Sequence, residues 1–190
     1  MSKLYTFGEM TQLLNAKAEN ISENSLVEGF SIDSRTLKTG DLFFCIKGEN
    51  TDGHRYISQA IERGACGVVA IRGKLSETLK NNDFPRILVP DPNRALREWA
   101  ADVRKQFSGK VLAITGSNGK TSTKDILAGL CRFVNPRSYA TPGNYNNFIG
   151  VSLTLLGATP EAKWWVIEIG TNQFGEIAEL SKIVQPTAAI

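Results

Sequence analysis

Residues 111–121 read Val-Leu-Ala-Ile-Thr-Gly-Ser-Asn-Gly-Lys-Thr, an apolar run that leads straight into a glycine-rich loop. The pattern predicts a buried strand over 111–115, a loop over 116–121 and a helix over 122–133. Glycines allow backbone N–H groups to turn toward phosphate oxygens, and the following helix adds its free N-terminal donors and the positive end of its dipole. The segment therefore predicts a phosphate-binding loop.

This loop predicts ATP and Mg²⁺ as ligands. Lys120 places a positive charge on the β and γ phosphates, and Thr121 offers a hydroxyl to Mg²⁺. The loop is two residues shorter than the common Gly-x-x-x-x-Gly-Lys-Thr form, in which a glycine would stand at Ile114. The alternative is a tight strand-to-helix turn with a solvated lysine. The residues predicted to contact the nucleotide are Thr115, Gly116, Ser117, Asn118, Gly119, Lys120, Thr121 and Ser122.

Downstream of the loop, strand and helix patterns continue to alternate. Residues 164–169 predict a second buried strand, 175–184 a helix, and 187–190 the start of a third strand. Such alternation predicts a parallel sheet with right-handed crossovers. Because a parallel sheet seldom ends on a short uncovered strand, we expect the chain to be part of a longer protein. The alternative is a natural edge strand at the C-terminus.

Glu168 lies inside the second of these strands, in Val-Ile-Glu-Ile-Gly at residues 166–170. A carboxylate there is costly to bury unless it is paired or binds a metal ion. Ligands of doubly wound sheets bind beyond the carboxyl ends of the strands, so we expect Glu168 and Thr121 to face the same crevice. Mg²⁺ prefers oxygen ligands, which makes these two residues the predicted metal ligands. The alternative is an ion pair with a neighbouring Lys or Arg.

The N-terminal part mixes short strands and helices. We place the domain boundary just before the strand predicted over 86–89, which gives domains 1–84 and 85–190. The predicted fold class is α/β: a small mixed α/β N-terminal domain, followed by the first half of a P-loop-type parallel-sheet ATPase domain. Strands are predicted over 26–32, 41–46, 66–71 and 86–89, and helices over 6–16, 54–64 and 93–107.

Three polar features outside the loop are candidate binding elements. Asp-Ser-Arg at 33–35 follows a predicted strand, and the guanidinium of Arg35 suits a diphosphate. Thr-Pro-Gly-Asn-Tyr-Asn-Asn at 141–147 offers amide donors and acceptors, although turn formation alone explains this segment better. His54 is the one histidine of the chain, and for it a helix-start or packing role is favoured over catalysis.

Composition and charge exclude several classes of protein. The net charge is only +3 and Lys and Arg are scattered, which argues against nucleic acid as a partner. No apolar run reaches the roughly 20 residues that cross a bilayer, and the N-terminus lacks a signal core, so we expect a cytoplasmic protein that does not bind membranes. Cys45, Cys66 and Cys131 are far apart and odd in number, which is typical of buried thiols rather than of a disulfide or zinc framework.

Taken together, these segments resemble the Mur ligase family over nearly the whole chain. The family's nucleotide loop, Thr-Gly-[Ser/Thr]-Asn-Gly-Lys-Thr, matches residues 115–121 and accounts for the short spacing. Within the family, the patterns Asn-x-Asn-Asn-x-x-Gly at 144–150 and Glu-x-Gly-x-Asn at 168–172 are most similar to the ligases that add D-alanyl-D-alanine. Further matching segments are Asp-Ser-Arg at 33–35, Gly-Asp-Leu-Phe-Phe at 40–44, Gly48 to His54, and Gly-Glu-Ile at 175–177.

The resemblance implies three domains, which bind a UDP-sugar, ATP and an incoming amino acid or dipeptide. It implies an ATP-dependent ligase of peptidoglycan precursor synthesis, acting on UDP-N-acetylmuramoyl-tripeptide and D-alanyl-D-alanine through an acyl phosphate. Lys120 and Glu168 are then the catalytic residues, with Thr121 and Glu168 on Mg²⁺. The implied substrate contacts are Ser34, Arg35, Asn144, Asn146 and Asn147.

The resemblance also implies parts that lie outside this sequence. The family's central-domain histidine and its carbamylated lysine are expected beyond residue 190, so we expect the chain alone to be inactive. We also expect the protein to be a monomer. One alternative is another ligase of this type, such as a folylpolyglutamate synthase. The other is a non-catalytic nucleotide-binding module.

Overall fold

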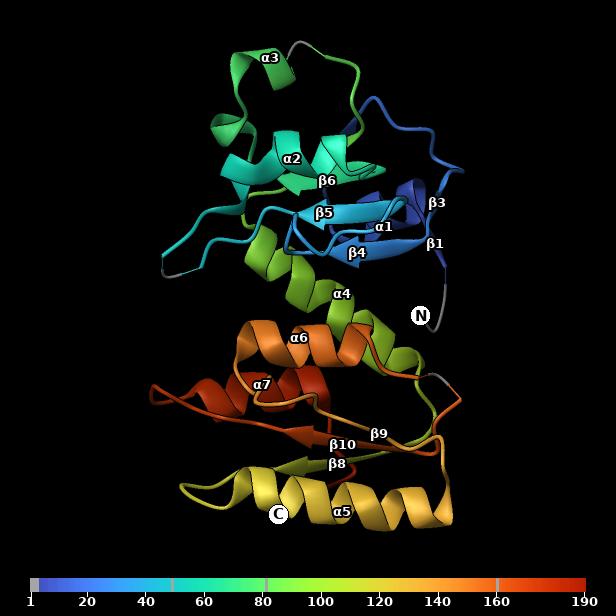
Figure 1. The fold of residues 1–190 in the computed structure, drawn as a ribbon, viewed down its shortest axis with the longest axis vertical. Coiled ribbons are helices and arrows are strands. Elements are labelled where there is room, and N and C mark those ends of the chain that lie inside the picture. Colours follow the sequence, from blue (N-terminus) through green and yellow to red (C-terminus); the bar gives the residue numbers. More distant parts are fainter. Residues whose placement is uncertain (1–3, 49, 81, 160) are drawn as a thin grey trace. The chain divides into compact units, whose positions relative to one another are not determined.

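The computed structural model describes residues 4–48, 50–80, 82–159 and 161–190. These residues form two compact units, Leu4–Leu96 and Arg97–Ile190, and each has its own sheet (Figure 1). The division falls inside helix α4 (Pro92–Gln106), whereas the sequence suggested a boundary between residues 84 and 85. It falls later because strand β7 (Arg86–Leu88) pairs with strands of the first unit.

The first unit contains a five-stranded sheet in the order β2-β7-β6-β5-β4. Four of its strands are parallel, and the edge strand β2 is antiparallel to β7. A separate antiparallel pair is formed by β1 and β3. The sheet strands are β2 (Lys17–Glu19), β4 (Gly29–Ser31), β5 (Asp41–Phe44), β6 (Gly67–Ala70) and β7, and the pair is β1 (Tyr5–Thr6) with β3 (Leu26–Val27).

Two predicted elements of the first unit are divided in the structure. The run predicted as one strand over 26–32 forms β3 and β4, which belong to different sheets. The helix predicted over 6–16 is α1 (Phe7–Leu13), and the left-handed conformation of Asn15, with φ of 44°, precedes β2. The apolar pattern continues across both breaks, so periodicity alone does not reveal them. Asn15 was the available signal for the end of α1, because Asn often adopts the left-handed conformation after a helix.

Short helices complete the first unit. Helix α1 begins with a capping box, in which Thr6 and Glu9 exchange backbone-to-side-chain hydrogen bonds of 2.9 and 3.1 Å. The helix predicted over 54–64 starts as a 3₁₀ turn before it becomes α-helical. The remaining elements are η1 (Gly53–Tyr56), α2 (Ile57–Glu62), η2 (Arg72–Lys74) and α3 (Glu77–Lys80).

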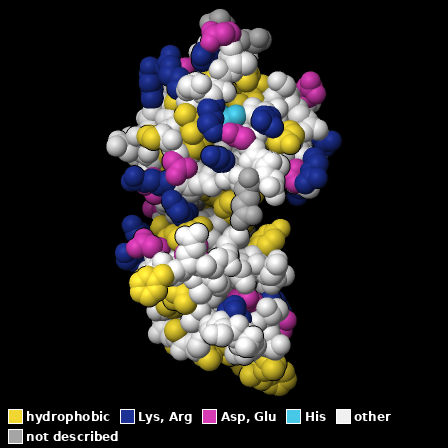
Figure 2. All heavy atoms as spheres, turned by 90° about the vertical axis from the view of Figure 1, so that its left-hand side faces the viewer, with side chains coloured by type: hydrophobic (Ala, Val, Ile, Leu, Met, Phe, Trp, Pro, Cys, Tyr) yellow, Lys and Arg dark blue, Asp and Glu magenta, His cyan; other side chains and the backbone are white. Residues whose placement is uncertain are grey.

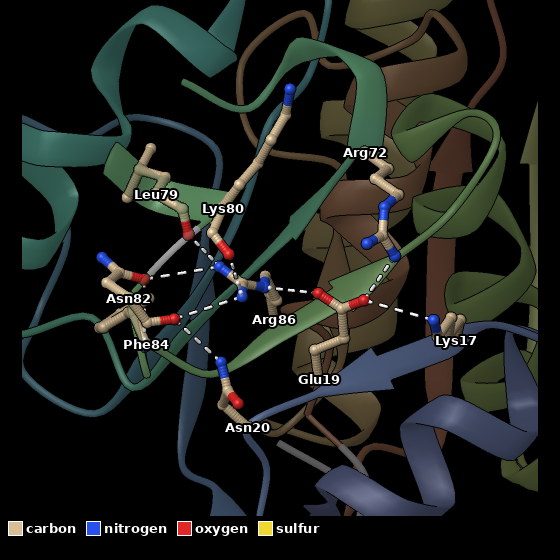
Figure 3. Close-up of polar contacts among 9 residues, drawn as sticks. All are labelled: Lys17, Glu19, Asn20, Arg72, Leu79, Lys80, Asn82, Phe84 and Arg86. Atoms are coloured by element: carbon tan, nitrogen blue, oxygen red, sulfur yellow. Dashed lines mark hydrogen bonds and ion pairs between the residues drawn. The ribbon is translucent and has the colours of Figure 1, made fainter. Parts of the chain in front are cut away.

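A buried arginine ties three segments of the first unit together (Figure 3). The side chain of Arg86 is 6% exposed, and its Nε donates to Glu19 Oε2 on β2 over 2.9 Å. Its terminal nitrogens donate to the backbone carbonyls of Leu79, Lys80 and Asn82. The guanidinium therefore joins the edge strand β2, the end of α3 and Asn82 to strand β7.

The second unit is a parallel sheet in the order β11-β8-β10-β9. Helix α5 covers one face of this sheet, and α6 and α7 lie on the other (Figure 1). The predicted parallel α/β arrangement is therefore confirmed. Its elements are β8 (Lys110–Ile114), α5 (Lys120–Val134), β9 (Tyr139–Ala140), α6 (Phe148–Leu156), β10 (Trp164–Glu168), α7 (Glu176–Val184) and β11 (Ala188–Ala189).

Aromatic and polar contacts fix the helices of the second unit. The rings of Phe107 and Trp165 stack with centroids 3.7 Å apart, and Trp165 is fully buried. Arg104 donates from Nε to Val184 O over 2.7 Å and from Nη2 to Gln185 O over 2.6 Å. These bonds satisfy carbonyls at the end of α7 that have no partner within the helix.

The register of the sheet positions the candidate site. Glu168 pairs with Ile114, so the carboxyl ends of β10 and β8 are level. The phosphate loop leaves the sheet immediately after Ile114, and the Ile169 N–H donates to Ile114 O over 2.8 Å. A side chain at Glu168 therefore lies at the same sheet edge as the loop, as expected for parallel strands.

The surface carries mixed charges. On the face that Figure 2 shows, Lys and Arg side chains are interspersed with Asp and Glu rather than gathered alone. Within the described residues, no helix is long and apolar enough to cross a membrane.

Candidate functional site

The phosphate loop of the second unit depends on two glycines. Gly116 has φ of 135° and Gly119 has φ of 75°, and both values favour glycine. An added Cβ would have space at either position, so backbone conformation rather than crowding requires the glycine. Gly119 is the N-cap of α5, which leaves the first-turn N–H groups of that helix free to meet an anion.

Lys120 lies at the first position of α5 and folds back over the loop. Its Nζ donates to Gly116 O over 2.7 Å. The side chain is partly exposed, whereas Ser117 and Asn118 are exposed at the tip of the loop. The ammonium thus already lies against the loop that the sequence predicts to hold phosphates.

Glu168 is 1% exposed and lies at the end of β10. Its Oε1 accepts hydrogen bonds from Asn146 Nδ2 over 2.8 Å and from Thr121 Oγ1 over 3.3 Å. Its Oε2 is buried and has no hydrogen-bond partner within the described residues. The predicted alternative was an ion pair, but no Lys or Arg of the described chain pairs with this carboxylate.

These residues fit a magnesium ion. A buried carboxylate oxygen without a donor is costly, and a bound cation would remove that cost. Thr121 and Glu168 supply oxygen atoms only, which is the ligand type that Mg²⁺ prefers. No group of three His, Cys, Asp or Glu side chains that could hold a metal occurs in the described residues. Mg²⁺ suits such a sparse site, because it commonly uses one or two carboxylates together with phosphates and water.

Residues 142–147 form what we call the asparagine loop. The Asn146 carbonyl accepts from the Gly170 N–H over 2.8 Å, while its side chain reaches Glu168. A Cβ at Gly170 would lie 2.8 Å from Asn146 Cγ, so only glycine leaves space for this side chain. Asn147 is the N-cap of α6, and its Oδ1 accepts from the Gly150 N–H over 2.8 Å.

The three predicted asparagines therefore have different surroundings. Asn146 joins the site around Glu168, Asn147 uses its side-chain oxygen as a helix cap, and Asn144 is exposed. Sequence reasoning missed Thr141, whose Oγ1 accepts from the buried Glu168 N–H over 2.9 Å. It also missed the packing role of Gly170. A polar residue beside the asparagine loop and a glycine after a strand were the available signals.

In the first unit, Ser34 and Arg35 line a cavity of about 440 Å³. Ser34 is 4% exposed, and its Oγ donates to Gln59 Oε1 over 2.6 Å. Tyr56 and Gln59, which line the same cavity, gave no signal in the sequence because they come from distant elements. The lining residues are Ile32, Asp33, Ser34, Arg35, Ile46, Thr51, Gly53, Tyr56 and Gln59.

Arg35 is oriented by its neighbour Asp33. The Arg35 Nε and Nη2 donate to the two oxygens of Asp33 over 2.9 and 2.6 Å. The Arg35 side chain and its N–H donate to the Asp33 carboxylate, and these bonds lower the pKa of Asp33 to about 2. The guanidinium itself is largely exposed, so it is oriented but accessible to an anion.

His54 has the packing role that the sequence favoured. Its side chain is 5% exposed, its Nε2 accepts from the Ile71 N–H over 2.9 Å, and its Nδ1 lies 2.6 Å from Asp52 Oδ1. Since Nε2 accepts, Nδ1 carries the proton and donates to Asp52. Burial raises the pKa of Asp52, but hydrogen bonds from Lys74 and His54 outweigh burial and leave the pKa lowered. Both ring nitrogens are thus committed to structural contacts.

Comparison with known families and structures gives consistent matches. The model of the Mur ligase middle domain matches residues 114–190, and that of the Mur ligase family, catalytic domain, matches residues 26–104. UDP-N-acetylmuramoyl-tripeptide–D-alanyl-D-alanine ligase of Haemophilus influenzae is 38% identical over 193 residues, which include 100% of this chain and 41% of the relative. The chain therefore spans about two fifths of the length of this relative.

Solved structures agree with these matches. MurF from Acinetobacter baumannii superposes with a TM-score of 0.87 at 32% identity, covering 98% of this chain and 40% of that one. MurF ligase from Thermotoga maritima, solved in complex with ADP, gives a TM-score of 0.73 at 34% identity over 84% of this chain and 36% of that one. The family matches, the relatives and the shared fold agree: this chain belongs to the Mur ligase family.

Proposed function

We propose that this chain supplies the UDP-sugar-binding and nucleotide-binding parts of an ATP-dependent amide ligase. The reaction joins D-alanyl-D-alanine to UDP-N-acetylmuramoyl-tripeptide. The observation that carries the proposal is the site at the ends of β8 and β10, where Thr121 and Asn146 both donate to Glu168 beside the phosphate loop. The similarity to a D-alanyl-D-alanine ligase and to an ADP-bound relative supports the substrates.

The proposed chemistry has two steps. The terminal carboxylate of the muramoyl tripeptide attacks the γ-phosphorus of ATP, and ADP leaves while an acyl phosphate forms. The amine of D-alanyl-D-alanine then attacks the acyl carbon, phosphate leaves, and the amine loses a proton as the amide forms. Phosphoryl transfer depends mainly on positioning and on neutralising charge, which are the tasks that a phosphate loop performs.

Each residue of the second unit has a role in this proposal. The N–H groups of residues 116–122 hold phosphate oxygens, and Lys120 neutralises charge on the γ-phosphate. Thr121 and Glu168 would hold Mg²⁺, which when bound supplies further positive charge to the phosphates. Asn144, Asn146 and Asn147 would orient the muramoyl peptide, and the first unit would bind uridine diphosphate at Ser34 and Arg35.

Titration calorimetry of UDP-N-acetylmuramoyl-tripeptide into this chain, without ATP, tests the proposal directly. We expect saturable binding that UDP competes away, because the first unit contains the whole cavity around Ser34 and Arg35. Binding that UDP cannot displace would contradict a UDP-sugar site. Competition by a folylpolyglutamate but not by UDP would favour the alternative ligase.

Glu168→Gln tests the proposed metal ligand. Glutamine keeps the shape and one acceptor oxygen for Asn146, but it removes the negative charge. We expect the Mg²⁺ concentration needed for half-maximal ADP binding to rise at least about tenfold. ADP titrations at a series of Mg²⁺ concentrations measure this shift. Glu179→Gln, on the exposed side of α7, is the matched control and should change nothing. An unchanged Mg²⁺ requirement in Glu168→Gln would leave Glu168 with a structural role only.

A further inference from the structure

Helix α5 carries a lysine on its buried face. Lys124 is 3% exposed, and Ala128 and Cys131, one and two turns later on the same face, are buried in the core of the second unit. A buried ammonium is costly unless it has partners. The proposed reaction gives Lys124 no role, because Lys124 belongs neither to the phosphate loop nor to the proposed metal ligands.

Lys124 is hydrogen-bonded to the asparagine loop. Its Nζ donates to Gly143 O over 3.1 Å, which joins α5 to that loop. Its other described partner is Asp125 Oδ1, also at 3.1 Å, but the side chain of Asp125 is 68% exposed. An ion pair with so exposed a partner contributes little. The bond to Gly143 is therefore the contact that distinguishes Lys124 from a surface lysine.

The asparagine loop is held from two sides. On one side the Gly170 N–H donates to Asn146 O over 2.8 Å, and on the other Lys124 holds Gly143 O. Between these points the Asn146 side chain donates to Glu168 Oε1 over 2.8 Å. Gly143 has φ of 51°, a conformation that few residues other than glycine adopt, so the carbonyl held by Lys124 lies at a sharp turn. Movement of that turn would shift Asn146 relative to Glu168.

We propose that Lys124 is a positioning residue for the Glu168 carboxylate. Its buried ammonium fixes the turn at Gly143, the turn fixes Asn146, and Asn146 holds Oε1 of Glu168. This leaves Oε2, which has no donor within the described residues, as the oxygen for the cation. The inference rests on the proposed function, because Lys124 acts on Glu168, a proposed Mg²⁺ ligand beside the phosphate loop.

Lys124→Met is the test variant. Methionine has a similar length but cannot donate to Gly143 O. Because Asp125 is 68% exposed, the substitution leaves no buried charge unpaired, and we expect the melting temperature to fall only slightly. Lys182→Met is the matched control, since Lys182 lies exposed on α7. Lys124→Arg keeps the charge and the donors, and it should rescue the effects of Lys124→Met at least in part.

Two measurements distinguish positioning from packing. Hydrogen exchange should become faster in residues 142–147 and at the Gly170 amide in Lys124→Met, and stay unchanged in β8 and in the Lys182→Met control. The Mg²⁺ concentration for half-maximal ADP binding should rise about fivefold in Lys124→Met, while ADP binding without Mg²⁺ stays the same.

Each outcome decides the inference. Unchanged exchange in residues 142–147 of Lys124→Met would overturn it, and so would an unchanged Mg²⁺ requirement. Equal loss of ADP binding with and without Mg²⁺ would also overturn it. If Lys124→Met does not fold, Lys124→Arg still decides, because an altered Mg²⁺ requirement despite normal exchange in 142–147 would refute the tether. Failure of the unmodified chain to bind ADP would instead refute the proposed function, and the inference with it.

Discussion

Lys120→Ala is expected to lower the affinity for Mg²⁺-ADP at least about 100-fold, because hydrogen bonds to charged groups contribute about 1.5–3 kcal/mol each. The prediction follows from the proposal that this amine binds the β-phosphate as well as the γ-phosphate. The free energy of unfolding should change by less than about 1 kcal/mol. Lys120 is partly exposed and its one described bond, to Gly116 O, is local. Alanine is also well suited to a helix.

Calorimetry with ADP and a thermal melt of the same samples check both halves of this prediction. Lys182→Ala is the control, because it removes one exposed positive charge from α7 and leaves the loop intact. An affinity equal to that of the unmodified chain would mean that residues 116–121 form only a strand-to-helix turn. A collapsed melting temperature would mean that Lys120 supports the fold.

Arg86→Met is expected to destabilise the first unit by about 3 kcal/mol. The substitution leaves Glu19 without its buried partner and frees three carbonyls on residues 79–82. Arg72→Met offers a matched control on the same carboxylate. Arg72 also bonds Glu19, over 2.5 Å, but its side chain is 62% exposed. Exposed pairs contribute about 0–1 kcal/mol, so this control should have a small effect.

Urea unfolding followed by hydrogen exchange resolves the effect by unit. Exchange should become faster in β2, β6 and β7 of Arg86→Met and remain unchanged in β8 and β10. Equal effects of Arg86→Met and Arg72→Met would contradict a role for burial. Faster exchange spread evenly over both units would contradict a local tie.

The contact between Arg86 and Glu19 also predicts that the stability of the first unit depends on pH. Burial raises the pKa of Glu19, but the hydrogen bond from Arg86 and the charge of Arg72 outweigh burial and hold the pKa below its ordinary 4.5. A lowered pKa means that the stabilisation is present above the ordinary value and is lost as the pH falls through the lowered one. The difference in unfolding free energy between Arg86→Met and the unmodified chain should therefore shrink below about pH 4.

The sequence predicted the parts of the site that depend on local order. The strand, glycine loop and helix around residues 111–133 lie next to one another in the chain, and parallel pairing then brings Glu168 level with Ile114. The site roles of Lys120, Thr121 and Glu168 stay predictions until binding is measured. Their proximity, however, followed from strand periodicity and sheet topology alone.

Long-range polar contacts were not predictable from the sequence. In the sequence, Lys124 resembles any solvated helical lysine, because its partner Gly143 lies in the asparagine loop, beyond β9. Likewise, the sequence places Arg86 at the start of a predicted strand, where a charged residue is usually exposed. Only the fold reveals that Glu19 lies beside it. Gln59 and Tyr56 reach the cavity of Ser34 from another element. Such pairings depend on tertiary structure rather than on propensity.

The two units also differ in their intrinsic spectroscopic groups. The chain has three tryptophans, Trp99, Trp164 and Trp165, and all three lie in the second unit, whereas the one histidine lies in the first. Indole fluorescence therefore reports on the second unit, and the imidazole resonances in a proton NMR spectrum report on the first unit, which contains the Ser34 cavity. A ligand added to unlabelled protein reveals which unit it reaches by the signal that changes.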